Sequence, residues 1–243
     1  MIREQLAGII PPERGFRWRG AEISRLEGFS DAVFAFALTL LVVSLEVPKT
    51  YHELIQAMRG FLAFAVCFAL LAEVWYSHYR FFRRYGLQTP WAVFLNCALL
   101  FFVLFYVYPL KFLFVTVFEG GGRIEVHEAR VLFVIYGLGY AAVFASLALL
   151  YLDAWKKRIA LALDDIERLK TRQSLTDHTA MIIVGLASAA LALLLPDRLV
   201  GLAGYFYLLI GVYFTLSGMF FGKRLREIQQ RISREADPAE TFL

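Results

Sequence analysis

Residues 25–47, RLEGFSDAVFAFALTLLVVSLEV, form the stretch that decides the fold. From Phe29 onward this stretch carries only two charged residues, one near each end. The 19 residues from Phe29 to Val47 are close in number to the ~20 that an α-helix needs to cross ~30 Å of hydrocarbon. Ser24 is followed three residues later by Glu27, which is the spacing of a capping box at the start of a helix. We therefore predict a first transmembrane helix that begins at Ser24 and ends at Val47.

The composition of the whole chain excludes an ordinary soluble domain. Hydrophobic residues make up 59% of the 243 residues, and the mean hydropathy is +0.59. A chain of this length is used up by one integral membrane domain of about six helices with short loops. We find no catalytic constellation and no metal-ligand spacing, so we predict no enzyme activity, no cofactor and no metal site. Cys67 and Cys97 are expected to be buried, reduced and inert.

Six helices are expected from the apolar stretches and from the residues that end them. The predicted helices are Ser24–Val47, Leu54–His78, Trp91–Phe118, Arg130–Leu152, Thr179–Leu195 and Leu199–Phe221. Pro109 predicts a kink in the third of them. Residues 153–178 are expected to form a polar connection that is helical in part. The chain then divides into a cytosolic N-terminal segment (1–23), a six-helix transmembrane channel domain (24–222) and a basic cytosolic tail (223–243).

The basic residues predict the orientation of the chain in the membrane. Of the 25 Lys and Arg residues, 19 fall in the N-terminal residues up to Arg25, the second and fourth connections and the tail, all on one side. Lys and Arg accumulate in cytoplasmic loops, so both termini should be cytosolic, and the helix count should be even. We expect a multi-pass protein of the inner (plasma) membrane. Anionic lipid headgroups explain the basic loops more simply than nucleic acid does.

A helical wheel separates two faces of the first helix. One narrow apolar stripe contains Phe29, Ala32, Phe36, Leu40, Val43 and Val47. Asp31 falls on the opposite side. A carboxylate deep in a membrane helix costs ~2.5–3.5 kcal/mol and is rarely kept without a partner or a water-lined path. From periodicity alone, the stripe packs against lipid or against another helix.

The pattern Arg25-x-x-x-Phe29-Ser30-Asp31 at the start of this helix resembles the signature of the TMEM175 family of lysosomal and prokaryotic potassium channels. A weaker second similarity is the pattern Trp75-x-x-His78-x-x-x-Phe82 at the end of the next helix. The resemblance implies a homotetramer around a central pore lined by the first helix, with K⁺ as the permeant ion. The sequence has no TVGYG-type filter loop. Carried over by position, the family's hydrophobic constriction falls on Phe36, Leu40 and Val43, with Val47 further along the same stripe.

The face opposite the stripe is expected to hold a structural network. We predict that Asp31 pairs with groups on the second and third helices, and that His78 and Asn96 are its candidate partners. Ser30 is expected to bond to a neighbouring helix or to its own backbone. On this interpretation Asp31 is a structural carboxylate and does not ligate the passing ion.

Two charges leave alternatives open. Arg25 falls on the stripe, where four copies would repel cations. Either the helix is irregular there and Arg25 joins a cluster with an acid, which we favour, or cation flow is poor. Glu73 lies inside the second helix and either pairs with Arg80 or faces a cavity.

The favoured function is thus a potassium-permeable cation channel with a hydrophobic constriction. The first alternative is a non-conducting oligomeric membrane protein of the same fold, in which the first helix serves oligomer packing. The second is a secondary transporter, which is weakened by the lack of an inverted repeat in the sequence.

Overall fold

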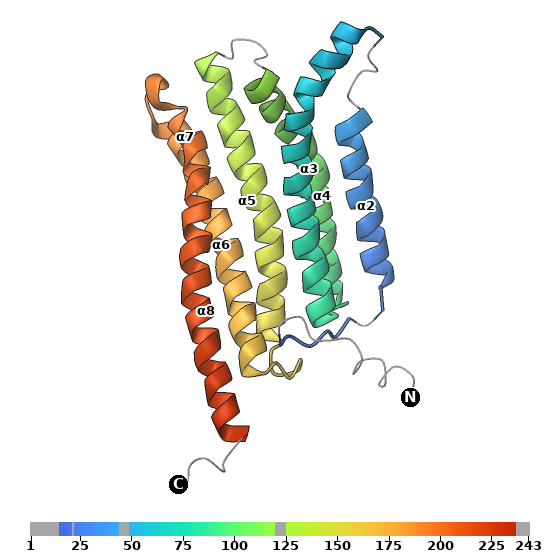
Figure 1. Ribbon diagram of the computed structural model, residues 1–243, viewed down its shortest axis with the longest axis vertical. Coiled ribbons are helices and arrows are strands. Elements are labelled where there is room, and N and C mark those ends of the chain that lie inside the picture. The colour runs from blue at the N-terminus through green and yellow to red at the C-terminus, as the bar shows by residue number, and fades with distance from the viewer. Residues whose placement is uncertain (1–14, 21, 44–48, 120–124, 237–243) are drawn as a thin grey trace.

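The computed structural model describes residues 15–20, 22–43, 49–119 and 125–236, which form six long helices running side by side (Figure 1). The long helices are α2 (Arg25–Val43), α3 (Tyr51–Tyr85), α4 (Pro90–Glu119), α5 (Val126–Lys156), α6 (Asp165–Leu194) and α8 (Leu209–Ala236). Three short helices, η1 (Asp197–Leu199), α7 (Leu202–Tyr205) and η2 (Phe206–Leu208), join α6 to α8. The start of α2 and the end of α8 lie at the same end of the bundle, and these two helices occupy opposite edges of it (Figure 1).

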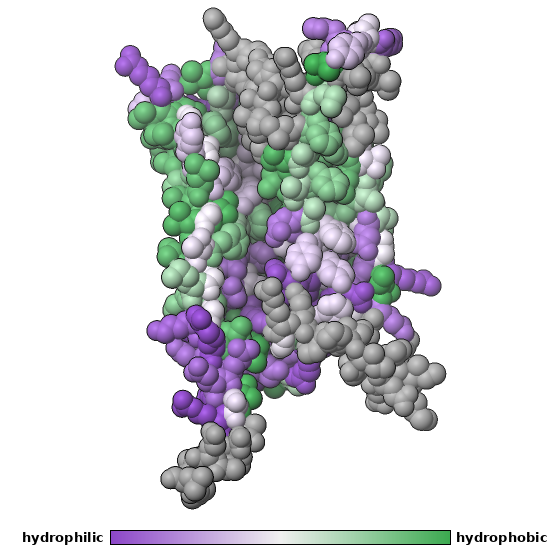
Figure 2. Space-filling view, viewed as in Figure 1, coloured by the Kyte–Doolittle hydropathy of each residue, from purple (hydrophilic) through white to green (hydrophobic). Residues whose placement is uncertain are grey.

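Four segments of the described chain are long and apolar enough to cross a membrane: Pro90–Phe112, Val126–Lys156, Asp165–Leu194 and Asp197–Arg234. Helices α2 and α3 complete the six-helix bundle, so the predicted helix number fits. Figure 2 shows a band of apolar side chains across the bundle and hydrophilic side chains at the end where α8 terminates. The protein is therefore a helical membrane protein with a polar end at the start of α2 and the end of α8.

The last two long helices differ from the sequence prediction in where they begin. Helix α6 starts at Asp165 rather than Thr179, because Asp164 and Glu167 form a capping box ahead of a polar first half. Helix α8 starts at Leu209 and continues to Ala236, through the basic stretch that the sequence suggested as a tail. In both cases the helix extends beyond the apolar stretch that identified it.

The core in the middle of the bundle joins α2, α3, α4 and α5. Its buried members include Phe34 and Leu41 from α2, Leu71 from α3, Leu99 from α4 and Leu147 from α5. Cys67 is buried in this core as predicted, but Cys97 is exposed, and both thiols are free. The prediction was wrong for Cys97 because this residue lies on the side of α4 that faces out of the bundle.

Close backbone contact joins α5 to α6. A Cβ added to Gly137 would lie 2.5 Å from the carbonyl oxygen of Gly185, and one added to Gly185 would lie 2.7 Å from the carbonyl oxygen of Gly137. Small residues let membrane helices approach in this way, so that van der Waals contact replaces the missing hydrophobic driving force. These two glycines therefore set the spacing of α5 and α6.

A second core closes the end of the bundle where α2 starts. Phe16, which precedes α2, is fully buried there, with its ring 5.5 Å from that of Tyr85 in an edge-to-face arrangement. The backbone N–H groups of Arg19 and Gly20 both donate to the carbonyl oxygen of Arg83 at 3.1 Å. Residues 15–20 are thus packed against the ends of α3 and α6 rather than free of the bundle.

Candidate functional site

A buried chain of hydrogen bonds connects three helices near the start of α2. Asn96 of α4 donates through Nδ2 to Ser30 Oγ at 2.9 Å, and its Oδ1 lies 2.8 Å from Nε2 of His78 on α3. Ser30 Oγ in turn donates to the carbonyl oxygen of Leu26 at 2.8 Å. Because an amide oxygen only accepts, His78 donates through Nε2. Ser30, His78 and Asn96 are at most 1% exposed, so the chain is sealed from solvent and lipid.

The neighbouring residue, Asp31, has a different partner. Its Oδ1 accepts a hydrogen bond of 2.8 Å from Nε1 of Trp75 on α3. The prediction that Asp31 pairs with a group on the second helix is confirmed, but the candidate partners His78 and Asn96 were wrong, because they bond to each other and to Ser30. Consecutive helical residues point about 100° apart, so only one of Ser30 and Asp31 can face α4. Ser30 takes that position, and Asp31 turns toward the outer side of α3.

The capping box predicted at the start of α2 is present. Ser24 N–H donates to Glu27 Oε2 at 2.8 Å, and Glu27 N–H donates to Ser24 Oγ at 3.1 Å. Glu27 is itself buried. The first two turns of α2 are thus fixed by the cap, by the buried chain through Ser30 and by the Asp31–Trp75 bond.

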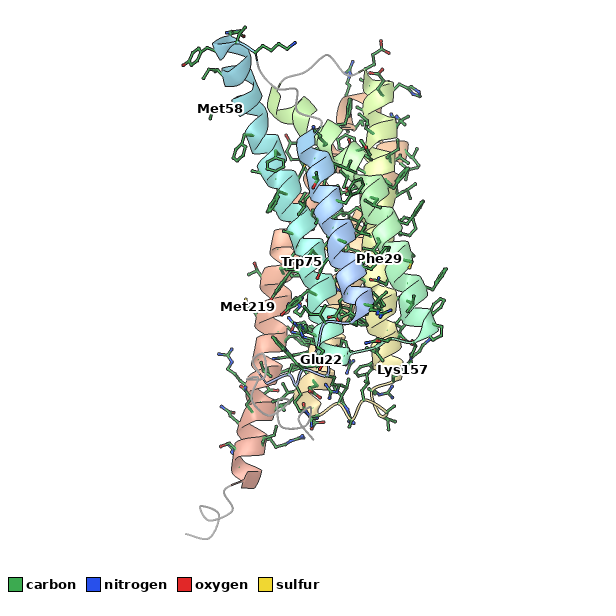
Figure 3. All side chains as sticks on the ribbon, turned by 90° about the vertical axis from the view of Figure 1, so that its right-hand side faces the viewer. Glu22, Phe29, Met58, Trp75, Lys157 and Met219 are labelled. Carbon is green, nitrogen blue, oxygen red and sulfur yellow. The ribbon has the colours of Figure 1, made fainter. Side chains whose placement is uncertain are left out.

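The predicted stripe lies mostly on the open face of α2. Phe29 and Phe36 are 56% and 57% exposed, and Ala32 between them is exposed as well. Figure 3 views the bundle from the α2 side, with Phe29 and Trp75 labelled beside that helix. Leu40 differs from the others because it is half-buried and packs against the central core. Val43 is the last residue of α2, and Val47 lies outside the described residues.

Comparison with known proteins identifies the family. A family model described as "Endosomal/lysosomal potassium channel TMEM175" matches residues 25–118. A protein of Marivirga tractuosa named "Potassium channel" is 38% identical over 246 residues, which cover 94% of this chain and 98% of that protein. The chain belongs to the TMEM175 family. The matched residues contain both the buried Ser30–Asn96–His78 chain and the Asp31–Trp75 bond.

Solved structures agree with this assignment to TMEM175. A crystal structure of the potassium channel MtTMEM175, in complex with a nanobody–MBP fusion, is 36% identical with a TM-score of 0.77 and covers 88% of this chain and 100% of that one. A TMEM175 homolog from Chamaesiphon minutus is 24% identical with a TM-score of 0.54 and covers 83% and 96%. The second supports the fold alone. TMEM175 is a family of channels and not of enzymes.

The two charges left open by the sequence now have positions in the TMEM175 fold. Helix α2 is regular from Arg25, whose side chain is exposed. Among the described residues no acid pairs with Arg25, so the favoured cluster is not seen within the single chain. Glu73 lines an internal cavity together with Arg80. In the same described ranges, no group of three or more His, Cys, Asp or Glu residues is arranged to hold a metal ion.

The sequence prediction missed one charged cluster. Glu167 of α6 is fully buried and accepts hydrogen bonds from Arg19 Nη2 at 2.6 Å and from the backbone N–H of Arg17 at 2.9 Å. The same carboxylate raises the pKa of the Arg17 guanidinium above its ordinary value, through their hydrogen bond and their opposite charges. The Asp164-x-x-Glu167 spacing was the available signal, but it predicts only a helix start. We call Arg17, Arg19 and Glu167 the N-terminal clasp.

Proposed function

We propose that this TMEM175 chain forms a homotetrameric, potassium-permeable cation channel whose central pore is lined by α2. The proposal rests on one observation: one face of α2 packs against the rest of the bundle, and its opposite, apolar face is left uncovered at the edge of the bundle. Identity of 38% over nearly the whole of a relative named "Potassium channel" supports the ion. Four copies that meet along the uncovered face would place Phe29, Ala32 and Phe36 around a common axis.

In this proposal the narrowest part of the pore is hydrophobic. Phe36, Leu40, Val43 and Val47 form its successive rings, with the uncovered Phe36 nearest to the buried polar chain. Rings of apolar side chains can gate by dewetting, and such a pore needs no TVGYG filter. Phe36 is a large planar side chain, so four of them at one level give a tight constriction and a low basal conductance. The half-buried position of Leu40 makes it a secondary contributor.

The proposed orientation places both termini in the cytosol and the channel in the plasma (inner) membrane. The basic residues support it, because the ends of α3 and α8 and the start of α6 lie at one end of the bundle (Figure 1). Positive charge on that side matches the cytoplasmic leaflet and its anionic headgroups.

Ion flux tests the proposal. Purified protein is reconstituted into liposomes, and flux is measured under K⁺ and Na⁺ gradients. Phe36→Ala should raise flux several-fold while the oligomer, measured by light scattering, stays intact. The matched control is Phe220→Ala on α8, at the opposite edge of the protomer, where Phe220 is 54% exposed. Equal flux from the parent protein and both variants would contradict pore lining by α2. It would favour the alternative in which the uncovered face of α2 serves only oligomer packing.

A further inference from the structure

A largely apolar cavity of about 290 Å³ lies inside each protomer, away from the uncovered face of α2. Helices α3, α4, α5, α6 and α8 all contribute to its wall, and α8 closes it with Ile210 and Phe214. Val143 of α5 and Met181 of α6 belong to its apolar part. Pockets of about this size and character hold small apolar or amphipathic ligands.

A second cleft, of about 260 Å³, adjoins this cavity at the basic end of the bundle. It is lined by Arg80, Arg84 and Lys170, together with Gln173 and Leu225. Arg80, Ser174 and Asp177 line both spaces, so the apolar cavity and the basic cleft lie side by side. The surface in Figure 2 is hollowed between the α8 side and the α3 side, with hydrophilic side chains in the lower part of the hollow.

The junction between the two spaces is polar and is not fully satisfied within the described chain. His178 lines the cavity and is 5% exposed, yet its Nε2 atom has no hydrogen-bond partner among the described residues. Asp177 is already engaged by α8, since its Oδ1 accepts from Ser217 at 2.8 Å and from Tyr213 at 3.0 Å. A buried polar group without a partner is costly, which points to a ligand group at His178.

The balance of charge in the cleft selects the kind of ligand. Arg80, Arg84 and Lys170 line the cleft with Asp177, whose carboxylate is held by two hydroxyl groups, and Glu73 lines the adjoining cavity, so the charged groups of the two spaces leave an excess of one positive charge. An apolar cavity, then a polar junction, then a basic cleft at the membrane surface is the order of groups in an anionic glycerophospholipid: acyl chain, ester and phosphate. Basic pockets between transmembrane helices bind such headgroups.

We propose that the cavity and the adjoining cleft together bind one anionic glycerophospholipid per protomer. An acyl chain occupies the cavity between α3, α5 and α8, and the phosphate lies in the cleft of Arg80, Arg84 and Lys170. The ester region lies beside His178 and Ser174. The lipid thereby joins α8 to α3, two helices that flank the hollow. This site is separate from the proposed pore and does not depend on ion conduction.

Lipid binding to the intact, delipidated oligomer tests the proposal. Native mass spectrometry measures the Kd of dioleoylphosphatidylglycerol, dioleoylphosphatidylcholine and dihexanoylphosphatidylglycerol, with inorganic phosphate as a competitor. The dioleoyl anionic lipid should bind at least about fivefold more tightly than the zwitterionic one, because a basic residue near a headgroup contributes a factor of this size. The short-chain lipid should bind weakly, and phosphate should not displace the long-chain lipid.

Two variants of equal charge change locate the binding. Lys170→Gln, in the cleft, should weaken binding of the dioleoyl anionic lipid about fivefold. Lys156→Gln, an exposed lysine at the same end of the bundle but outside the cleft, should leave it unchanged. Equal binding of the two dioleoyl lipids, equal effects of the two variants, or displacement by phosphate alone would each overturn the proposal. So would absence of binding to the oligomer, as expected if a second copy of the chain covers the hollow.

Discussion

The buried Ser30–Asn96–His78 chain predicts a specific pattern of coupling between mutations. Asn96→Leu keeps the approximate shape of the side chain but leaves Nε2–H of His78 without an acceptor in a place that is 1% exposed. Stranding a buried group costs about 1–3 kcal/mol, whereas single interhelical bonds in membranes average about 0.6 and reach about 1.7 kcal/mol. Ser30 keeps its bond to Leu26, so only one group is stranded. We therefore expect Asn96→Leu to lower the free energy of unfolding by about 1–2 kcal/mol.

The companion variant is His78→Phe. His78 lies between the rings of Phe34 and Phe82, at centroid distances of 5.7 and 4.7 Å, so a phenyl ring has apolar neighbours there. The single variant His78→Phe leaves the side-chain oxygen of Asn96 without a donor, so it should lower the free energy of unfolding by a similar amount. In the double variant neither group is stranded, because replacing both partners by apolar groups of similar shape is nearly neutral. Its loss should therefore be smaller than the sum of the two single losses by about 1 kcal/mol or more.

The assay is reversible unfolding in mixed micelles by increasing SDS, followed by circular dichroism, with parent, single and double variants compared. If the double variant loses as much free energy of unfolding as the two single variants together, the reasoning is refuted. It would mean that His78 and Asn96 do not act as one unit and that the anchoring of α2 to α3 and α4 lies elsewhere.

Three further predictions concern other contacts of the same bundle. Asp31→Ala and Trp75→Phe should each lower the stability of the oligomer by about 1 kcal/mol, with no further loss in the double variant; a changed K⁺ to Na⁺ flux ratio with normal assembly would instead place the carboxylate in the pore. Glu167→Gln should weaken the N-terminal clasp by about 2 kcal/mol and speed trypsin cleavage ahead of α2, and unchanged cleavage kinetics would argue against the clasp. Gly185→Ala should cost about 1–3 kcal/mol by overpacking, whereas Gly218→Ala, with open space around its Cβ position, should be neutral in the same unfolding assay.

Local signals in the sequence were sufficient to predict where α2 begins and which residues form its apolar stripe. The capping box of Ser24 and Glu27 involves residues three apart, and it is present as expected. The stripe follows from helical periodicity, and Phe29 and Phe36 are indeed on the uncovered face. Both properties depend on one helix alone, so a single sequence carries them.

Pairing between helices depends on their relative rotation, which a single sequence does not contain. The choice between Ser30 and Asp31 as the partner of Asn96 is decided by about 100° of rotation of α2, and the sequence offered both. The burial of Glu167 was equally hidden. Glu167 lies among Asp164, Asp165, Arg168 and Lys170, as an exposed residue would, and its partners, Arg17 and Arg19, lie about 150 residues earlier.

The two ends of α2 are held differently: polar side chains fix its first two turns, whereas apolar packing of Phe34, Ala37 and Leu41 and a bond from Lys111 Nζ to the Leu41 carbonyl oxygen hold the rest. The residue 15–20 segment, the capping box and the bonds of Ser30 and Asp31 all hold the start of α2, so a tilt that keeps these contacts and repacks the apolar ones pivots near residue 30. At a rise of 1.5 Å per residue, Phe36 lies about 9 Å from that pivot and Val43 about 20 Å. A tilt of about 10° would then move the backbone by about 1.6 Å at Phe36 and about 3.4 Å at Val43. Such a tilt therefore moves the backbone little at Phe36 and about twice as far at Val43, the last residue of α2.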